Sequence, residues 1–452
     1  MTPETTRGPH ARAFVLATLG LALAALLLIG GADALAGGKA GVKTPKRVKV
    51  EGPTTTSLKL RWKDTSRSER FFEIKIGPGS RTIKAARNTT TKTITGLDAG
   101  ATYSLKIRAC EKRSSCSRYS RKIEGVTAEE PLGSRPLFGY NETVTPGAPG
   151  NALLSGSGAD FVRVPIGWAN QQPTPLTYNW RNMDAIKQEL ASRGLKPLWV
   201  ISSAPCWAQL DLTCSPKDTA MAPASLFYGA YANFIVQVAK RYPDSTAIQV
   251  WNEPNIPKFW RPAPSSSAYR SLLTQTLSAV TAAGVKVPIV FGAPSPVSAA
   301  DAKADPTKIP TTTFFNQVLN GGMPNLDAVA VHPYSFLEGG DQIANSIERF
   351  DEAEAVLKNL VPNVPVWVTE VGFTTSGRHR VSAQEQADAL TSVYRAFVQR
   401  GVKLITVHRF FDDSTPPYPF EAGMGVIAAD QSTPKPAYCA LAELRGATPA
   451  VC

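Results

Sequence analysis

Hydrophobic and polar positions follow two different patterns along this chain of 452 residues. Between residues 42 and 128, apolar side chains alternate with polar ones in short runs, as at Leu58, Leu60 and Trp62. Alternation with a period of two is typical of strands that bury one face, and turn residues such as those at 77–79 separate the runs. The segment is therefore predicted to be a small all-β sandwich with Trp62 in its core.

A different pattern begins after residues 129–135, a short linker that Pro131 and the adjacent Pro136 stiffen. From residue 136 to residue 447, continuous apolar runs alternate with amphipathic helical segments. This alternation is typical of parallel strands joined by crossover helices. The predicted strands are 137–141, 161–166, 198–202, 248–252, 287–292, 328–332, 366–370 and 404–410, and the predicted helices include 180–193, 226–241, 268–283, 346–360 and 383–400.

Eight β/α units of this length predict an α/β fold, a (β/α)8 TIM barrel, behind the sandwich. The first unit is the least regular, because its helix near residues 151–158 is short. Enzymes with this fold carry their chemistry at the carboxyl ends of the strands. Candidate functional residues are therefore sought at those ends.

The N-terminal residues 1–36 have the features of a secretory signal peptide. Arg7 and Arg12 precede an apolar run over residues 13–29, and Ala34-Leu35-Ala36 offers a cleavage site before Gly37. The run is also long enough to span a bilayer, so an uncleaved membrane anchor is the alternative. Either outcome places the rest of the chain outside the cytoplasm, as a secreted, extracellular or cell-envelope protein.

Positive charge is concentrated in the predicted sandwich. Residues 37–128 contain 22 Lys and Arg against 7 Asp and Glu, a net charge of +15, whereas the whole chain carries +13. Outward-facing residues such as Lys59, Arg61 and Lys63 contribute to this excess. We expect either an anionic partner, such as an acidic cell-wall polymer, or simple solubility. Nucleic acid is not expected, because the chain is exported and has no base-stacking motif.

The six cysteines form three pairs of near neighbours: Cys110 with Cys116, Cys206 with Cys214, and Cys439 with Cys452. An even number at short spacing in an exported chain predicts three local disulfides. No pair has Cys-x-x-Cys spacing and the four histidines are scattered, so neither a metal nor another cofactor is expected.

Two carboxylates lie at the ends of predicted strands. Glu253 follows the fourth strand in Trp251-Asn252-Glu253-Pro254, and Glu370 closes the seventh. Strands four and seven face each other across the mouth of a closed barrel, and two opposed carboxylates are the minimum equipment for glycoside hydrolysis. Asn252 and Trp251 offer an amide and a ring to a sugar. By strand parity, Val368 is expected to point inward with Glu370, and Trp367 toward the helices.

Residues 132–447 resemble clan A glycoside hydrolases, in particular families 5 and 39. The resemblance implies that Glu253 is the acid/base, that Asn252 bonds the 2-hydroxyl of the sugar, and that Glu370 is the nucleophile of a retaining enzyme. Arg163 is similar to an arginine that supports this nucleophile in family 5. Residues 97–103, with Tyr103, resemble the tyrosine corner of fibronectin type III domains.

His332 and Tyr334 match the His-x-Tyr motif of family 5, whose tyrosine bonds the nucleophile. Core packing at His332 and an interior ion pair at Arg163 remain the structural alternatives. Trp168, Trp207 and Trp260 lie in loops expected at the mouth, where they either stack on sugars or pack. The eighth strand departs from the family, because it reads Val407-His408-Arg409-Phe410 where a tryptophan is usual. His408 or Phe410 is expected to take that place.

The sequence thus predicts a secreted retaining glycosidase that hydrolyses O-glycosidic, β-linked bonds of a polysaccharide or oligosaccharide. Its acid must stay protonated, which burial near Trp251 and repulsion from ionised Glu370 would favour. A non-catalytic glycan-binding or cell-wall adhesion protein is the alternative. A serine hydrolase is not expected, because no Gly-x-Ser-x-Gly elbow is present.

Overall fold

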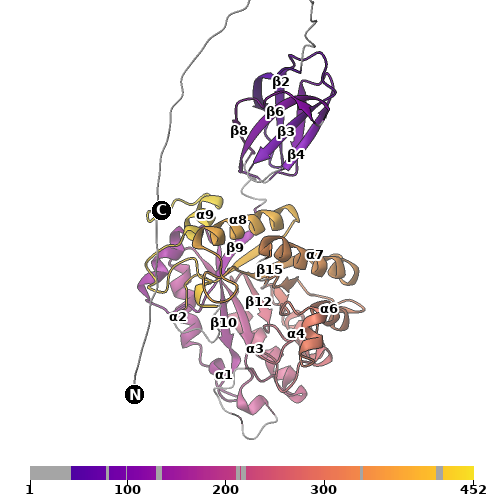
Figure 1. The fold of residues 1–452 in the computed structure, drawn as a ribbon. Helices are drawn as coiled ribbons and strands as arrows, with labels where there is room; N and C mark the ends of the chain where they lie inside the picture. The colour runs from indigo at the N-terminus through magenta and orange to yellow at the C-terminus, as the bar shows by residue number, and fades with distance from the viewer. Residues whose placement is uncertain are drawn as a thin grey trace, which may run out of the picture.

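The computed structural model describes residues 42–452 except 78–80, 98, 113, 129–134, 210–213, 215–219, 336–339 and 414–420. The predicted leader and most of the predicted linker lie outside the described residues. Two bodies follow each other along the chain, an all-β sandwich and a barrel surrounded by helices (Figure 1). Among the residues described, no helix has the length and apolar character needed to cross a membrane.

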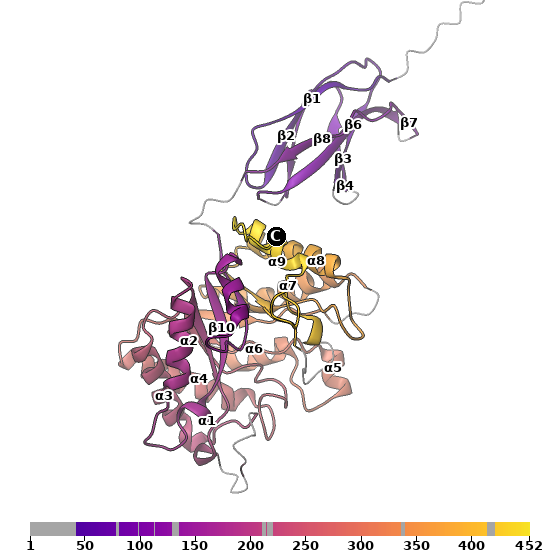
Figure 2. The same ribbon diagram turned by 90° about the vertical axis from the view of Figure 1, so that its left-hand side faces the viewer.

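The sandwich consists of two antiparallel sheets (Figure 2). One sheet has the strand order β1-β2-β5, and the other has the order β4-β3-β6-β7, with β8 paired to β6. Trp62 is buried and packs against Phe72, with 5.1 Å between ring centroids, so the predicted core residue is confirmed. The strands are β1 (Lys46–Glu51), β2 (Ser57–Lys63), β3 (Phe71–Gly77), β4 (Arg81–Ala86), β5 (Thr91–Thr95), β6 (Thr102–Lys112), β7 (Ser115–Cys116) and β8 (Ile123–Val126).

Eight parallel strands close into the predicted barrel in sequence order, with β16 pairing back to β9. The predicted fold class is therefore confirmed. Side chains on the outer side of the strands pack against the helices, which cover the barrel on its outside (Figure 1). The strands are β9 (Leu137–Asn141), β10 (Phe161–Gly167), β11 (Lys196–Ser202), β12 (Ala247–Val250), β13 (Ile289–Phe291), β14 (Ala328–Val331), β15 (Val366–Val371) and β16 (Leu404–His408).

The connections are mostly the amphipathic helices that the apolar periodicity predicts. The first unit carries only the 3-10 helix η1 (Pro149–Gly156), where proline and glycine residues do not favour a regular α-helix. Helices α1, α5, α6 and α9 lie outside the helical segments named from the sequence. The α-helices are α1 (Trp168–Gln171), α2 (Arg181–Ala191), α3 (Tyr228–Arg241), α4 (Ser266–Ala282), α5 (Ala299–Ala304), α6 (Thr311–Leu319), α7 (Gln342–Leu360), α8 (Ala383–Gln399) and α9 (Pro436–Leu444).

The predicted orientation of strand β15 is wrong. Trp367 packs with the barrel-interior cluster that includes Val200 and Ala330, and Val368 belongs to the layer under the helices. The register against β16 changes within β15, because Val368 pairs with Ile405 but Val371 pairs with Val407. Three steps on one strand thus oppose two on the other, which is a β-bulge. Counting parity back from Glu370 fails because the bulge interrupts the alternation.

All three predicted disulfides are present. Cys110 is fully buried yet lies outside the aromatic core of the sandwich, and it bonds Cys116 on the neighbouring strand β7. Cys439 in α9 holds the C-terminal residue Cys452. These covalent links restrain short loops and a chain end, where packing alone supplies few contacts.

Candidate active site

The loop after β12 carries the first candidate carboxylate. Trp251 and Glu253 have φ angles of 72° and 42°, in the left-handed region that non-glycine residues seldom occupy. Pro254 prevents the strand from continuing, and the Glu253 N–H donates to Ala293 O at 2.9 Å. Strained backbone of this kind persists where the surroundings hold it, and it is frequent at functional sites. The turn presents Asn252 and Glu253 at the barrel mouth.

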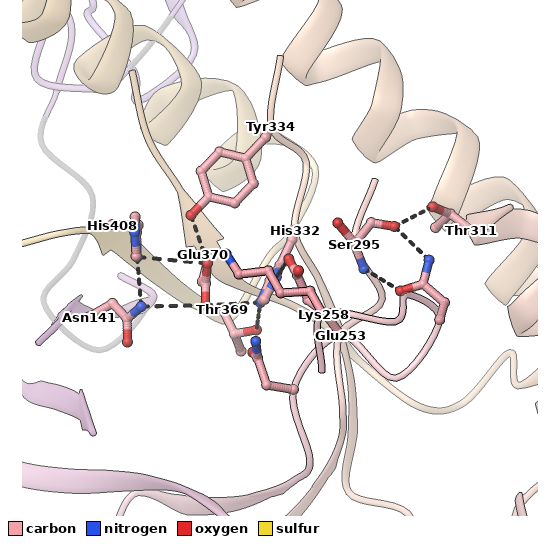
Figure 3. Close-up of polar contacts among 12 residues, drawn as sticks. Asn141, Glu253, Lys258, Ser295, Thr311, His332, Tyr334, Thr369, Glu370 and His408 are labelled. Atoms are coloured by element: carbon pink, nitrogen blue, oxygen red, sulfur yellow. Dashed lines mark hydrogen bonds and ion pairs between the residues drawn. The ribbon is translucent and has the colours of Figure 1, made fainter. Parts of the chain in front are cut away.

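Hydrogen bonds to residues that follow β13 hold the Glu253 loop in place. The Asn255 side chain donates to Ser295 O and Ile309 O, both at 3.0 Å, and accepts from the Ser295 N–H at 2.7 Å. Thr311 also donates to Ser295 O, at 2.8 Å (Figure 3). Asn255 is fully buried, so these bonds are protected from competition with water. The position of Glu253 is consequently fixed by a packed loop.

The second candidate carboxylate, Glu370, lies within the β15 bulge. Thr369 and Glu370 are consecutive, yet both reach the mouth: the Thr369 hydroxyl lies 3.2 Å from His332 Nε2, and Glu370 receives bonds from several side chains. In a regular strand two consecutive residues would point to opposite faces. The bulge therefore aims Glu370 into the site, a use of β-bulges that is common beside active sites.

Glu370 is held by an arginine, a tyrosine and an asparagine. Arg163 Nη1 donates to its Oε1 at 2.6 Å, Tyr334 donates to its Oε2 at 2.7 Å, and Asn141 Nδ2 lies 3.4 Å from Oε1. Figure 3 shows Asn141 and Tyr334 on different sides of the carboxylate. Glu370 and Tyr334 are buried, with 7% and 5% of their surface exposed. The carboxylate is thereby fixed in position by groups from two further strands, β9 and β10, and from the loop after β14.

Arg163 connects the two candidate carboxylate loops. Its guanidinium also donates to Asn252 Oδ1 at 2.7 Å, to Asn141 Oδ1 at 3.0 Å and to Gln249 Oε1 at 3.3 Å. Only 2% of the arginine is exposed. The predicted interior ion pair and the predicted support of Glu370 are thus the same interaction.

His332 lies between the two candidate acids. Its Nδ1 is 2.9 Å from Glu253 Oε1, and its Nε2 is 3.7 Å from Glu370 Oε1 (Figure 3). The imidazole has no exposed surface. Hydrogen bonds at both ring nitrogens, to Glu253 and to Thr369, fix the ring orientation. The histidine is therefore buried in the core and is also a direct neighbour of the acids.

The surroundings favour an ionised Glu370. Burial by itself raises the pKa of this carboxyl, but electrostatic interactions with the His332, Arg163 and His408 side chains and the hydrogen bond from Tyr334 outweigh burial and hold the pKa well below its usual range. Burial, with the nearby charges of Glu370 and Glu253, raises the pKa of Tyr334 well above its usual value. The tyrosine accordingly stays protonated, and its hydroxyl donates a hydrogen bond to Glu370.

His408 is the last residue of the eighth strand, one of the two residues expected where a tryptophan is usual. Its Nδ1 lies 2.7 Å from Asn141 Nδ2 and 3.7 Å from Glu370 Oε2, and its ring meets that of Tyr334 edge to face (Figure 3). Burial lowers the pKa of His408 to about 4, so the ring is neutral at ordinary pH. Phe410 is fully buried against Tyr140 and does not reach the mouth.

The structure does not support sugar stacking at three of the predicted tryptophans. Trp168, Trp251 and Trp260 are 0%, 0% and 2% exposed. Trp168 packs between Trp207 and Tyr231, and Trp251 packs against Trp260. Loops at the mouth of a barrel need a core of their own, and these large rings supply it. Trp207 is partly buried and donates to Gln172 O at 3.0 Å, which fixes its ring beside the Cys206 disulfide.

Glu253, His332 and Glu370 each offer one ligand atom, and the three atoms lie within 4.8 Å of one another. Such a cluster has the donor atoms that a transition metal accepts. The guanidinium of Arg163 already occupies Glu370 Oε1 at 2.6 Å, and its positive charge opposes a cation at the same oxygen. The arrangement consequently suits an ionised Glu370 paired with Arg163 better than a metal ion.

Sequence reasoning missed Asn141, Gln249 and Thr369. All three lie inside the barrel near the carboxyl ends of strands, and two of them contact Arg163. The position of Asn141 at the end of the first strand was a usable signal, because polar residues at strand ends line the mouth of such barrels. Gln249 and Thr369 carried no signal, since an isolated polar residue inside a strand has many structural explanations.

Comparison with known proteins agrees with this architecture. Residues 43–126 match the fibronectin type III domain, and residues 134–405 match Cellulase (glycosyl hydrolase family 5). No curated protein matches the chain.

Solved structures share the fold at low sequence identity. A family 39 glycoside hydrolase from the gut symbiont Bacteroides cellulosilyticus WH2 has 19% identity and a TM-score of 0.53, covering 89% of this chain and 81% of that one. GH5_18 from Streptomyces cattleya, in complex with GlcNAc, has 21% identity and a TM-score of 0.52, covering 70% of this chain and 82% of that one. GH5_18 from Bifidobacterium longum subsp. longum ATCC 55813 has 17% identity and a TM-score of 0.52, covering 69% and 79%.

A closed parallel barrel with two buried carboxylates facing each other at its mouth defines the molecule as a glycosidase. The family match covers more than half of the chain. The chain belongs to the Cellulase family, glycosyl hydrolase family 5, and carries a fibronectin type III domain in front of its barrel.

Proposed function

We propose that this glycosidase is a secreted retaining enzyme that cleaves β-linked bonds of a polysaccharide or oligosaccharide. The observation that carries the retaining mechanism is the separation of the two carboxylates, whose nearest oxygens lie within 4.8 Å. Retaining glycosidases place their carboxyl groups roughly 5–5.5 Å apart, whereas inverting ones need about 6.5–9.5 Å to admit a water molecule. The short separation favours a covalent intermediate.

In the proposed first step, ionised Glu370 attacks the anomeric carbon while Glu253 gives its proton to the glycosidic oxygen. The bond between that oxygen and the anomeric carbon breaks, the leaving sugar departs with the proton, and a glycosyl ester forms on Glu370. In the second step, Glu253 takes a proton from water, whose oxygen attacks the same carbon and releases Glu370 as a carboxylate. Two displacements restore the original anomeric configuration.

Neighbouring side chains suit these roles. Arg163 and Tyr334 keep Glu370 ionised and oriented, and Asn252, held by Arg163 at 2.7 Å, lies beside Glu253 to bond the 2-hydroxyl of the sugar. Preorganised donors of this kind lower the cost of developing charge because they need not reorient during the reaction.

The β linkage and the export of the chain rest on separate support. A variant of the Streptomyces cattleya GH5_18 structure, with 19% identity and a TM-score of 0.52, is in complex with Manβ1-4GlcNAc. Three disulfides are typical of proteins that fold in oxidising compartments. N-terminal sequencing of the protein recovered from culture medium tests export, and a mature start at Gly37 is expected.

The mechanism is tested with a 2-deoxy-2-fluoro glycoside that carries a good leaving group. The fluorine slows the second step, so the enzyme should gain the mass of one fluoro-sugar, and peptide mapping should place it on Glu370. NMR of the first-formed product from an unmodified substrate should show the β-anomer. Formation of the α-anomer first, or labelling of Glu253, would overturn the proposed assignment.

A further inference from the structure

The outer face of the β1-β2-β5 sheet in the sandwich carries several cationic side chains. We call this array the cation ladder and define it as the exposed cations of β1 and β2 that lie in register with a residue of the other strand. Glu51 is the single carboxylate among the outward side chains of these two strands. The cation ladder consists of Lys46, Lys49, Lys59, Arg61 and Lys63.

The register of the two strands places like charges directly opposite each other. Lys46 pairs with Lys63 and Lys49 pairs with Arg61, whereas Lys59 pairs with Glu51. Directly opposed like charges destabilise a sheet, so these positions are unfavourable for the isolated domain. A bound anion would relieve this repulsion along the face.

Little of that compensation comes from the protein. Glu51 Oε1 lies 2.6 Å from Lys49 Nζ, and its Oε2 lies 3.2 Å from Arg61 Nε. Within the described part of the chain, Lys46, Lys59 and Lys63 have no carboxylate at ion-pair distance. Lys49 and Arg61 are also 61% and 52% exposed at their side chains. The face therefore keeps an excess of accessible positive charge.

The geometry of the cation ladder suits a linear polyanion. Alternate residues along a strand are about 7 Å apart and neighbouring strands about 4.8 Å apart, so the cations form a narrow two-row strip. Strand β5 continues the same face with Thr91 opposite Arg61 and Thr93 opposite Lys59. Their hydroxyls offer hydrogen bonds to sugar hydroxyls beside the charged rows.

The face lacks the aromatic side chains that single-stranded nucleic acids stack on and the large apolar side chains that enter a bilayer. None of the outward side chains of β1, β2 and β5 named above is aromatic, so no base can stack on them. None is a large apolar residue that could enter a bilayer. Charge with hydroxyls and without rings matches a polysaccharide that bears carboxylates.

We propose that the cation ladder binds a carboxylate-bearing polysaccharide and holds the barrel near such a polymer. The binding is a property of the sandwich and goes beyond the hydrolytic function of the mouth, because no cation ladder residue belongs to the barrel. Exposed charges are screened by salt, with a Debye length of about 10 Å at 0.1 M. Retention on the polymer should accordingly fall steeply as salt rises.

The test uses the full chain on immobilised polygalacturonate, with elution by a sodium chloride gradient and a parallel binding titration at 50 mM salt. The variant is Lys46→Thr/Lys63→Thr, which removes one pair of opposed cations from the cation ladder. The matched control is Lys75→Thr/Lys106→Thr. These two lysines are also directly opposed, but on strands β3 and β6 of the other sheet. Both variants lower the net charge by two.

We expect the cation ladder variant to weaken binding to polygalacturonate by about tenfold and the control to weaken it by less than threefold. If both variants lose the same affinity for polygalacturonate, binding depends only on the net charge of the protein, and the proposal of a localised binding face is wrong. If the two variants differ instead on duplex DNA or on vesicles with 30% anionic phospholipid, but not on polygalacturonate, the polysaccharide proposal fails. Fluoro-sugar labelling of Glu370 is read separately, so failure of either proposal leaves the other intact.

Discussion

Cationic side chains are paired with acceptors at the barrel mouth but are exposed and opposed to each other in the sandwich. At the barrel mouth, Arg163 is 2% exposed and its guanidinium donates hydrogen bonds to four side-chain oxygens, including Glu370 Oε1 at 2.6 Å. In the sandwich, Lys46 and Lys63 are exposed and face each other. The mouth surrounds a charge with partners from its own chain, whereas the sandwich leaves charges uncompensated.

The difference follows from the environment of each charge. A buried charge without a partner costs several kcal/mol, so burial at the mouth demands a complete network. A solvated charge costs little, so the sheet surface tolerates repulsion of a few tenths of a kcal/mol per pair. The mouth therefore makes a rigid reaction site, and the sheet surface stays available for an external anion. The five predictions below test this difference, starting with the largest expected effect, at the mouth, and ending with the smallest, at the sheet surface.

Replacing the proposed nucleophile should have the largest effect. Glu370→Gln keeps the shape of the side chain and a partner for Tyr334, but an amide cannot form the glycosyl ester. We expect turnover to fall by about 10⁴-fold or more, in the range seen when a covalent nucleophile is removed. Steady-state kinetics should give the same ratio of wild-type to variant turnover at 0.05 M and 0.5 M salt, because salt screens the buried pair of Arg163 and Glu370 very little. Turnover within tenfold of the wild type would mean that another residue is the nucleophile.

Replacing the proposed acid should cost less. Glu253→Ala removes general acid catalysis, which contributes about 10²–10⁴-fold. Substrates with poor leaving groups should lose the full amount, while an aryl glycoside with a nitrophenolate leaving group should form the intermediate almost as fast as before. A comparison of kcat/KM for the two substrate types measures the difference. Equal losses on both would remove Glu253 from the role of acid.

Removing the buried cation should destabilise the barrel. Arg163→Met leaves Glu370 buried without its ion-pair partner, and loss of one member of a buried pair costs about 3–5 kcal/mol. Urea unfolding followed by tryptophan fluorescence reports mainly on the barrel, which contains seven of the eight tryptophans. The double variant Arg163→Met/Glu370→Gln should recover part of the loss, because no unpaired charge remains. A double variant as unstable as the single one would show that packing, and not charge, explains the loss.

His408 should make stability depend on pH in a defined window. Its pKa is lowered from 6.5 to about 4 by burial, so between these values the unfolded chain binds a proton that the folded chain does not. Stability must then fall as the pH drops from 6.5 toward 4, by an amount on the order of 2–3 kcal/mol. The depressed pKa of Glu370 adds its own loss only below the ordinary carboxyl range.

The variant His408→Gln should flatten the stability curve between pH 6.5 and 4.5, as measured by urea unfolding at several pH values. His379→Gln is the control for loss of a histidine away from Glu370. If the dependence of stability on pH remains in His408→Gln but is lost in His379→Gln, the proton is taken up by His379 and the prediction is wrong.

At the surface, removing a charge should have the smallest effect and the opposite sign. Lys63→Thr relieves the repulsion with Lys46, so the sandwich should gain about 0.2–1 kcal/mol. Hydrogen exchange of the β1 and β2 amides in the full chain measures this local gain. The gain should shrink at 0.5 M salt because repulsion between exposed charges is screened. A loss of protection would show that Lys63 contributes packing to the sheet.

The sequence by itself determined the architecture and the two principal acids. Period-two alternation identified the sandwich, and alternating strand and helix patterns identified the barrel. Glu253, just before Pro254, and Glu370, two residues before Gly372, stood at strand ends. These features are local: each depends on which face a short segment must bury. Local patterns survive without knowledge of what packs against them.

Only the tertiary structure decided which side chains surround those acids. Asn141, Gln249 and His408 meet Arg163 or Glu370 from strands that lie far apart in sequence. The bulge in β15 reversed the predicted direction of Trp367, because register against β16 is set by pairing and not by the strand alone. The opposed lysines of the cation ladder likewise emerged only from the register of β1 on β2. Pairing and closure of the barrel bring distant residues together, and a single sequence does not encode that register in any local pattern.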